Sequence, residues 1–475
     1  MKKIIYSLPI LISLSAFAQD KQAVKYAKTI KAEDLKEHLT ILASDEYEGR
    51  ETGKKGQKMA AEYIANQFQR LGLEAPVDGS YLQKFSLASS SMTASYFRKG
   101  DEKKAAFEDF VYLSRSETAG EEYIKIVIAD PEDSKVKSYK DAYIAYPVDS
   151  YSSLQERIDV AKEAGAKGFI EVIEPDGEFS NTLKSFSRFM KRPGLDLGSR
   201  DNKGDKMIIV GKELMAWIFE KDYDQILAGD EVEVVFNADY LDKPLWTENV
   251  LGFLKGSEKP EEIVVITAHY DHIGITNGEI NNGADDDGSG TVTVLEIAEA
   301  FMAAATKNRG PKRSILFMTV TGEEKGLLGS RYYTDFDPVF PLANTVANLN
   351  IDMVGRVDEK HEGNPDYIYL IGSDKLSKEL HDLSENVNTT YSNLELDYTY
   401  NDENDPNRFY YRSDHYNFAK NNIPIIFYFN GVHADYHKPT DTIEKINFEK
   451  IEKIARLVFH TGWEIANREE RIKVD

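Results

Sequence analysis

Apolar residues along this chain gather into short continuous runs that predict strands buried on both faces. Five such runs follow one another in the second half of the sequence, at 263–268, 314–321, 346–352, 367–371 and 423–429. Between the first two, residues 292–304 carry apolar side chains at helical spacing. This alternation predicts an α/β fold, in which helices flank a mixed, mainly parallel central sheet.

The first half of the chain has a different pattern. Leucines and other apolar residues recur at helical spacing across 32–76, with a glycine-containing turn at 46–53. Residues 115–240 then alternate strands and helices and contain no histidine. We therefore expect a helical first part at 19–114, a small inserted α/β domain at 115–240, and the remainder of the main domain at 241–475.

The first 18 residues have the pattern of a secretory signal. Lys2 and Lys3 precede an apolar stretch at 4–14, and Ala16-Phe17-Ala18 is typical of a cleavage site. An uncleaved anchor is the alternative, although the stretch is short for a bilayer. No later stretch reaches the length of a spanning helix, so we expect an exported protein, periplasmic or secreted, whose mature chain does not insert into a membrane.

Charge and composition exclude several function classes. The chain carries 58 Lys+Arg against 81 Asp+Glu, a net charge of −23, which argues against nucleic acid as a partner. It contains no cysteine, which excludes disulfides, a thiol nucleophile and cysteine-ligated metals.

Histidines and carboxylates follow the predicted strands, where active sites of such sheets lie. They are His269, Asp271, Asp285, Asp286, Asp287, Glu323, Glu324, Asp352 and His437. Imidazole and carboxylate ligands together suit zinc. A bridging carboxylate could hold two ions that activate a water, and a further carboxylate could accept the proton of that water.

Other interpretations of single residues deserve comparison. The aspartate triplet lacks the spacing of a calcium loop, but Asp286 could simply cap the next helix. His272, His415 and His433 lie near the cluster in sequence, and we expect His272 to be a neighbour rather than a ligand. Asp441 could support the His437 loop or belong to an ordinary turn.

These motifs, in this order and spacing, resemble the co-catalytic di-zinc aminopeptidases, which include bacterial leucyl aminopeptidases and glutamate carboxypeptidase. The likeness is close over 246–445 and looser over 32–76, and the insert resembles a protease-associated domain. The resemblance implies two zinc ions. His269 and Asp352 would bind one, and Glu324 and His437 the other. Asp286 would bridge both.

The resemblance also implies roles around the ions. Glu323 would be the general base acting on a zinc-bridging water, and Asp271 would fix the imidazole of His269. Tyr436 would contact the oxyanion, whereas Asp414 and His415 match a segment near the substrate pocket.

The expected function is that of an exported, zinc-dependent exopeptidase that removes amino-terminal residues from peptides. A carboxypeptidase, or a glutaminyl-cyclase-like acyltransferase with one zinc, would share this fold. A non-catalytic binding protein, similar to the transferrin receptor, would be expected to have lost ligands. The sequence leaves the side-chain preference and the oligomeric state open.

Overall fold

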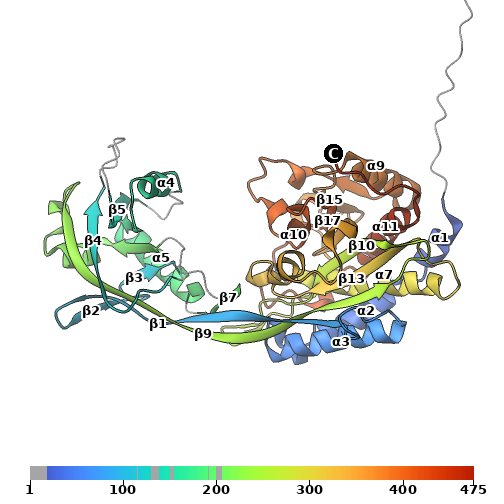
Figure 1. The fold of residues 1–475 in the computed structure, drawn as a ribbon, viewed down its shortest axis with the longest axis horizontal. Helices are drawn as coiled ribbons and strands as arrows, with labels where there is room; N and C mark the ends of the chain where they lie inside the picture. Colours follow the sequence, from blue (N-terminus) through green and yellow to red (C-terminus); the bar gives the residue numbers. More distant parts are fainter. Residues whose placement is uncertain (1–18, 115, 130–138, 150–154, 191, 199–205) are drawn as a thin grey trace, which may run out of the picture. The chain divides into compact units, whose positions relative to one another are not determined.

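The computed structural model describes residues 19–475 except 115, 130–138, 150–154, 191 and 199–205 (Figure 1). The chain forms two compact units. The main unit comprises the chain up to Phe85 and from Thr247 onward, and the inserted unit comprises Ser86–Trp246. The proposed signal at 1–18 lies outside the described residues. Among the described helices, none is both long and apolar enough to cross a membrane.

The main unit contains the expected mixed sheet, which confirms the predicted fold class. Four neighbouring strands are parallel, and β9 and β15 run antiparallel to them at the two sides. The strand order is β16 (Glu395–Asp397), β15 (Tyr367–Ile371), β17 (Ile425–Phe429), β14 (Thr345–Ile351), β10 (Lys259–His269), β13 (Arg313–Val320) and the last residues of β9 (Glu231–Leu254).

Both faces of this sheet are buried, as the continuous apolar runs predicted. Val264 and Ile266 pack with one hydrophobic cluster, whereas their neighbours Ile263 and Val265 pack with another. Because side chains alternate along a strand, the two clusters lie on opposite faces. The helices whose residues join the first cluster are α1 (Lys21–Ala27), α2 (Ala32–Leu42), α3 (Lys55–Leu71), α7 (Gly290–Ala305), α9 (Lys378–Val387) and α11 (Phe448–Asn467).

The strands of the inserted unit pair in sequence from the first residues of β9. The described strands run in the order β9, β4 (Glu122–Ile128), β5 (Ala142–Val148), β6 (Gly168–Ile173), β8 (Lys206–Gly211) and β3 (Phe110–Tyr112), with β4 to β8 parallel. Helices α4 (Gln155–Glu163), α5 (Asp176–Met190) and α6 (Lys212–Phe219) lie between or after these strands, and β7 (Gly194–Leu197) lies between α5 and β8.

The inserted unit begins earlier in the chain than the pattern suggested. Residues 86–114, which the sequence analysis placed with the helical part, contribute β3, β2 (Glu102–Ala105) and most of β1 (Leu82–Lys99). The strand β1 is rich in serine and has few large apolar residues, so its pattern carries little sign of a buried strand.

Candidate metal centre

The candidate ligands come from the carboxyl ends of four parallel strands. His269 is the last residue of β10, and Asp352 follows β14 directly. Glu323 and Glu324 lie in the short turn η4 (Glu323–Lys325) after β13, and His437 lies in the loop after β17. Because these strands are parallel neighbours, their ends meet at one edge of the sheet.

Asp286 lies between two pairs of these side chains. Its Oδ1 atom is 3.4 Å from Nε2 of His269, which is itself 3.5 Å from Oδ1 of Asp352. We call His269 and Asp352 the first half-site. The Oδ2 atom of Asp286 is 3.1 Å from Nε2 of His437, which lies 3.1 Å from Oε2 of Glu324. We call His437 and Glu324 the second half-site.

The protonation of His269 suits a metal ligand. Its Nδ1 atom is 3.0 Å from the main-chain oxygen of Asp271, and a carbonyl oxygen can only accept a hydrogen bond. Nδ1 therefore carries the hydrogen when the ring is neutral, and the lone pair of Nε2 faces Asp286 and Asp352.

The electrostatics of the second half-site also indicate a place for a cation. Burial alone would raise the pKa of Glu324, but the neighbouring imidazoles of His272 and His437 lower it to about 2. Oδ2 of Asp286 and Oε1 of Glu324 are buried without a well-directed hydrogen bond among the described residues. Buried charged oxygens of this kind are favourable when a cation is bound, so the donor set fits zinc.

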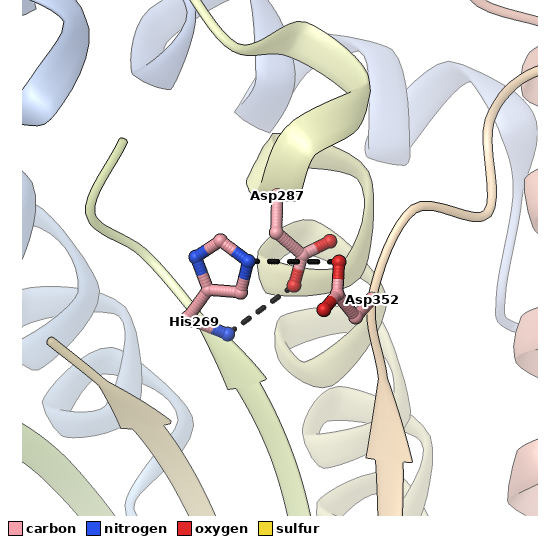
Figure 2. A group of neighbouring side chains, drawn as sticks. All are labelled: His269, Asp287 and Asp352. Atoms are coloured by element: carbon pink, nitrogen blue, oxygen red, sulfur yellow. Dashed lines mark hydrogen bonds and ion pairs between the residues drawn. The ribbon is translucent and has the colours of Figure 1, made fainter. Parts of the chain in front are cut away.

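Asp287, the third residue of the triplet, has a different role from Asp286. One of its oxygens accepts a hydrogen bond from the backbone N–H group of His269 at 3.2 Å (Figure 2). The other accepts from the backbone N–H groups of Gly290 at 2.8 Å and Met353 at 3.0 Å. Gly290 permits this close approach, because a Cβ atom there would lie 2.4 Å from the carboxylate. Asp287 thus ties together three segments that carry ligands.

His272 lies closer to the centre than the sequence suggested. Its Nδ1 atom is 2.8 Å from Oε1 of Glu324 and 3.7 Å from Oδ2 of Asp286, and the side chain is fully buried. His272, Asp286 and Glu324 could therefore hold an ion together, as could His269, Asp287 and Asp352. In the sequence, the feature that could have indicated His272 as a ligand is its position three residues after His269, in His269-Tyr-Asp-His272.

Glu323 faces the first half-site. Its Oε2 atom is 3.9 Å from Nε2 of His269. Burial raises the pKa of Glu323 well above its usual value, and Glu324, Asp352 and Asp414 raise it further, against the opposing effect of His269. The place of Glu323 beside the candidate ligands is that of a carboxylate which could accept a proton from a water molecule.

The carboxylate of Asp271 lies closer to the backbone N–H of Glu323 than to the imidazole of His269. Its Oδ1 atom accepts a hydrogen bond from the backbone N–H of Glu323 at 3.2 Å but lies 3.9 Å from Nδ1 of His269. The imidazole is instead held by the main-chain oxygen of the same residue. Asp271 therefore contacts the imidazole of His269 through its main-chain oxygen, while its side chain contacts Glu323.

A small cavity opens beside the centre and is rich in aromatic side chains. Besides four of the acids and histidines already described, it is lined by Met353, Phe409, Arg412, Phe427, Phe429, Val432 and Tyr436. The sequence analysis named only Tyr436 among these. The others are distributed over the strand β17 and three connecting segments, and only the fold brings them together.

Asp414 and His415, expected near the substrate, do not line this cavity. Asp414 is fully buried and accepts a hydrogen bond from Ser330 at 2.5 Å, and burial raises its pKa to about 7. His415 begins the buried helix α10 (His415–Ala419), where its ring stacks on Phe427. Burial lowers the pKa of His415 to about 3. Of the two, only His415 packs on a residue that lines the cavity, namely Phe427.

The contacts of Asp441 decide between its two interpretations, namely support of the His437 loop or an ordinary turn. One oxygen of this buried carboxylate accepts hydrogen bonds from the backbone N–H groups of Asp285 at 3.0 Å and Asp286 at 3.2 Å. His433, from the same loop, lies 3.2 Å from the carboxylate of Asp285. The loop that carries His437 is thus tied to the turn that carries Asp286.

Comparisons with known proteins agree with this architecture. The model of peptidase family M28 matches residues 249–462, which include all the candidate ligands. A protein named "Probable leucine aminopeptidase" from Trichophyton verrucosum is 30% identical over 324 residues, which are 65% of this chain and 78% of that protein. The chain belongs to peptidase family M28.

Other M28-like proteins give a consistent but partial match. The aminopeptidase YwaD of Bacillus subtilis is 30% identical over 234 residues, and the aligned part spans 48% of this chain and 46% of that protein. Among solved structures, the aminopeptidase from Aneurinibacillus sp. strain AM-1 has a TM-score of 0.58 at 19% identity, with 95% of this chain and 98% of that chain covered. A zinc aminopeptidase from Bacillus subtilis has a TM-score of 0.55 at 20% identity, covering 93% and 96%. These two structures share the fold.

Proposed function

We propose that this protein is an aminopeptidase that works with two zinc ions. His269, Asp286 and Asp352 would hold one ion, and His437, Asp286 and Glu324 the other. The observation that carries this proposal is the position of Asp286, whose two carboxylate oxygens face two different histidine–carboxylate pairs. The relatives named as zinc peptidases and aminopeptidases support it.

Bound zinc would supply Lewis-acid polarisation of the peptide carbonyl and a lowered pKa for water. The chain's own contribution is proton transfer and orientation. Glu323 takes the proton from the attacking water and passes it to the nitrogen of the leaving amine. Glu323 is placed for both transfers, because its Oε2 atom lies 3.9 Å from Nε2 of His269.

Tyr436 is placed to stabilise negative charge on the substrate. It lines the cavity beside Glu323 and packs against the ring of His437 at 3.9 Å between centroids. Burial, with the nearby acids, raises the pKa of its hydroxyl, so the group stays protonated and can donate a hydrogen bond to an oxyanion.

The lining of the cavity supports a preference for apolar amino-terminal residues. Phe409, Phe427, Phe429, Met353 and Val432 offer an apolar lining next to the centre. The surrounding carboxylates would attract the free ammonium group of a peptide. A carboxypeptidase or a cyclase-like acyltransferase remains the alternative function of the same fold, and a substrate panel separates them.

The decisive experiment combines activity with metal counting. Leucyl and phenylalanyl p-nitroanilides should be hydrolysed, N-acetylated peptides should not, and a chelator should abolish activity. Glu323→Gln should retain two zinc ions per chain by native mass spectrometry while kcat falls by roughly a hundredfold to ten-thousandfold. Substantial turnover by that variant would refute the role of Glu323, and cleavage of blocked peptides would refute the aminopeptidase.

Export and the nature of the insert belong to the same proposal. The pattern at 2–18 supports cleavage after Ala18, and the parallel sheet of the inserted unit supports a protease-associated domain. The mass of the protein purified from the periplasm or medium tests the first part. A chain that begins at Gln19 is expected, whereas an intact chain beginning at Met1 would contradict cleavage.

A further inference from the structure

A short segment from the N-terminal helical region reaches into the base of the metal centre. It comprises Gly49–Thr52, which includes the last two residues of η1 (Asp45–Arg50) and precedes α3, and we call it the clamp. The sequence analysis treated this stretch only as a glycine-containing turn, and the proposed mechanism makes no use of it. Most of its contacts described below nevertheless lead to segments that carry candidate ligands or Glu323.

Arg50 is the central residue of the clamp. Its side chain is fully buried, and its guanidinium donates hydrogen bonds to four main-chain carbonyl oxygens. These oxygens belong to Tyr270 at 2.8 Å, Leu42 at 2.7 Å, Asn282 at 2.7 Å and Gly283 at 2.8 Å. Tyr270 directly follows the candidate ligand His269, and Gly283 opens the turn that carries Asp286. One side chain therefore fixes both ligand-bearing loops.

The charge of Arg50 also fits this location. The carboxylates of Asp271, Asp286, Asp287 and Asp441 all attract its guanidinium. A rigid, planar group with five donors can bond several carbonyls at fixed angles, which a lysine ammonium cannot reproduce. The geometry thus favours arginine specifically.

The backbone of the clamp lies directly against the His272 loop. The N–H of His272 donates to the carbonyl of Arg50 at 3.3 Å, and that of Gly274 donates to the carbonyl of Gly49 at 3.1 Å. Gly49 has a φ of +65°, and a Cβ atom there would lie 2.2 Å from the carbonyl oxygen of Asn281. Only glycine combines this conformation with so close an approach.

Thr52 extends the clamp to the proposed base. Its hydroxyl donates to Oδ2 of Asp271 at 2.7 Å, while Oδ1 of the same carboxylate accepts from the backbone N–H of Glu323 at 3.2 Å. Thr52 and Asp271 are both buried. A continuous hydrogen-bonded chain therefore leads from Thr52 through Asp271 to Glu323.

We propose that the clamp is a positioning device for the reaction, in which Arg50 fixes the loops that bind zinc and Thr52 fixes the orientation of Glu323 through Asp271. This inference rests on the proposed function. It assigns separate roles to Arg50 and Thr52. Arg50 should control zinc affinity, whereas Thr52 should control the rate of the chemical step.

The Thr52 part is tested by Thr52→Val, with Thr52→Ser as the matched control. Valine keeps the shape but removes the hydroxyl, so kcat should fall about tenfold to a hundredfold while KM and zinc content stay unchanged. Serine restores the donor and should restore most of kcat. A wild-type kcat for Thr52→Val, or a lower melting temperature as its only effect, would overturn this part.

The Arg50 part is tested by zinc competition with a fluorescent chelator, which requires no activity. Arg50→Lys should weaken zinc binding by about tenfold to a hundredfold. The control is Arg313→Lys, because Arg313 is equally buried and donates to the carbonyls of Ile465, Arg468 and Glu469 away from the centre.

The control should leave zinc affinity at the wild-type value. Equal zinc affinities for Arg50→Lys and the wild type would overturn the proposal, as would equal losses in both variants. If Arg50→Lys does not fold, the Thr52 pair still decides whether the clamp acts on the reaction. Failure of the proposed function would look different, because the wild type itself would then lack activity.

Discussion

The two half-sites of the candidate centre have the same chemistry but different surroundings. Each pairs one histidine with one carboxylate around an oxygen of Asp286. In the first, the side chains of His269 and Asp352 are 1% and 10% exposed. In the second, Glu324 is 5% exposed, but His437 is 37% exposed. The ligands of the first half-site are therefore nearly buried, whereas the second half-site is partly exposed at its histidine.

The contacts that hold the ligands also differ between the two half-sites. His269 ends a central strand and is held by the carbonyl of Asp271, and Asp352 accepts a hydrogen bond from Ser413 at 2.7 Å. His437 lies in a loop, has a backbone φ of +56° and packs on Tyr436. Since rigid, desolvated ligands hold a metal more firmly, we expect the first half-site to bind zinc more tightly and to release it later.

The largest expected effect comes from removing either histidine. His269→Asn should lower kcat/KM on the order of a thousandfold, because several kcal/mol of metal stabilisation are lost beside Glu323. His437→Asn should keep one zinc ion and lose about tenfold to a hundredfold. Native mass spectrometry and kinetics on leucyl p-nitroanilide measure both variants. The reverse order of the two effects would contradict the comparison.

An intermediate effect is expected from Ser413→Ala. The substitution removes the hydroxyl that orients Asp352, so zinc should bind the first half-site about tenfold more weakly. Ser377→Ala is the control, because Ser377 caps helix α9 by accepting the N–H of Leu380. It should cost about 1 kcal/mol of unfolding free energy without changing zinc affinity. Identical zinc affinities in both variants would remove the proposed support of Asp352.

The smallest expected effect is the change with pH in the melting temperature of the zinc-free protein. Burial lowers the pKa of His437, but hydrogen bonds to Asp286 and Glu324 outweigh this and raise it from 6.5 to about 10. Because the folded-state pKa is raised, protonated His437 stabilises the fold fully below about pH 6.5 and loses this effect as pH rises through about 10.

The melting temperature of the zinc-free wild type should therefore exceed that of His437→Gln at pH 6, and the difference should shrink toward pH 10. Zinc requires the neutral imidazole, so zinc affinity should rise over the same range. A difference in melting temperature that does not depend on pH would show that the charge of His437 contributes nothing.

The sequence was sufficient to predict the sheet and the residues at the ends of its strands. His269, Asp352 and the two glutamates follow long apolar runs, and parallel strands bring such positions together. His437 was found through its resemblance to a known motif, because no pattern within its own loop indicates a ligand.

Other features depend on the path of loops and could not be read from the sequence. The orientation of Asp271 toward Glu323 depends on the turn after β13, and the contact of His272 with Glu324 joins residues from two loops. Asp414 stands beside other polar residues in the sequence, yet α10 buries it completely. Polar residues that are close in sequence therefore differ in exposure, because the fold buries some of their side chains and leaves others at the surface.

The most direct test of the central claim is the anomalous X-ray diffraction of zinc-loaded crystals at the zinc absorption edge. We expect two peaks, one on each side of Asp286, with His269 and Asp352 at the first and His437 and Glu324 at the second. A single peak, or a second ion bound through His272 while His437 stays unligated, would contradict the account.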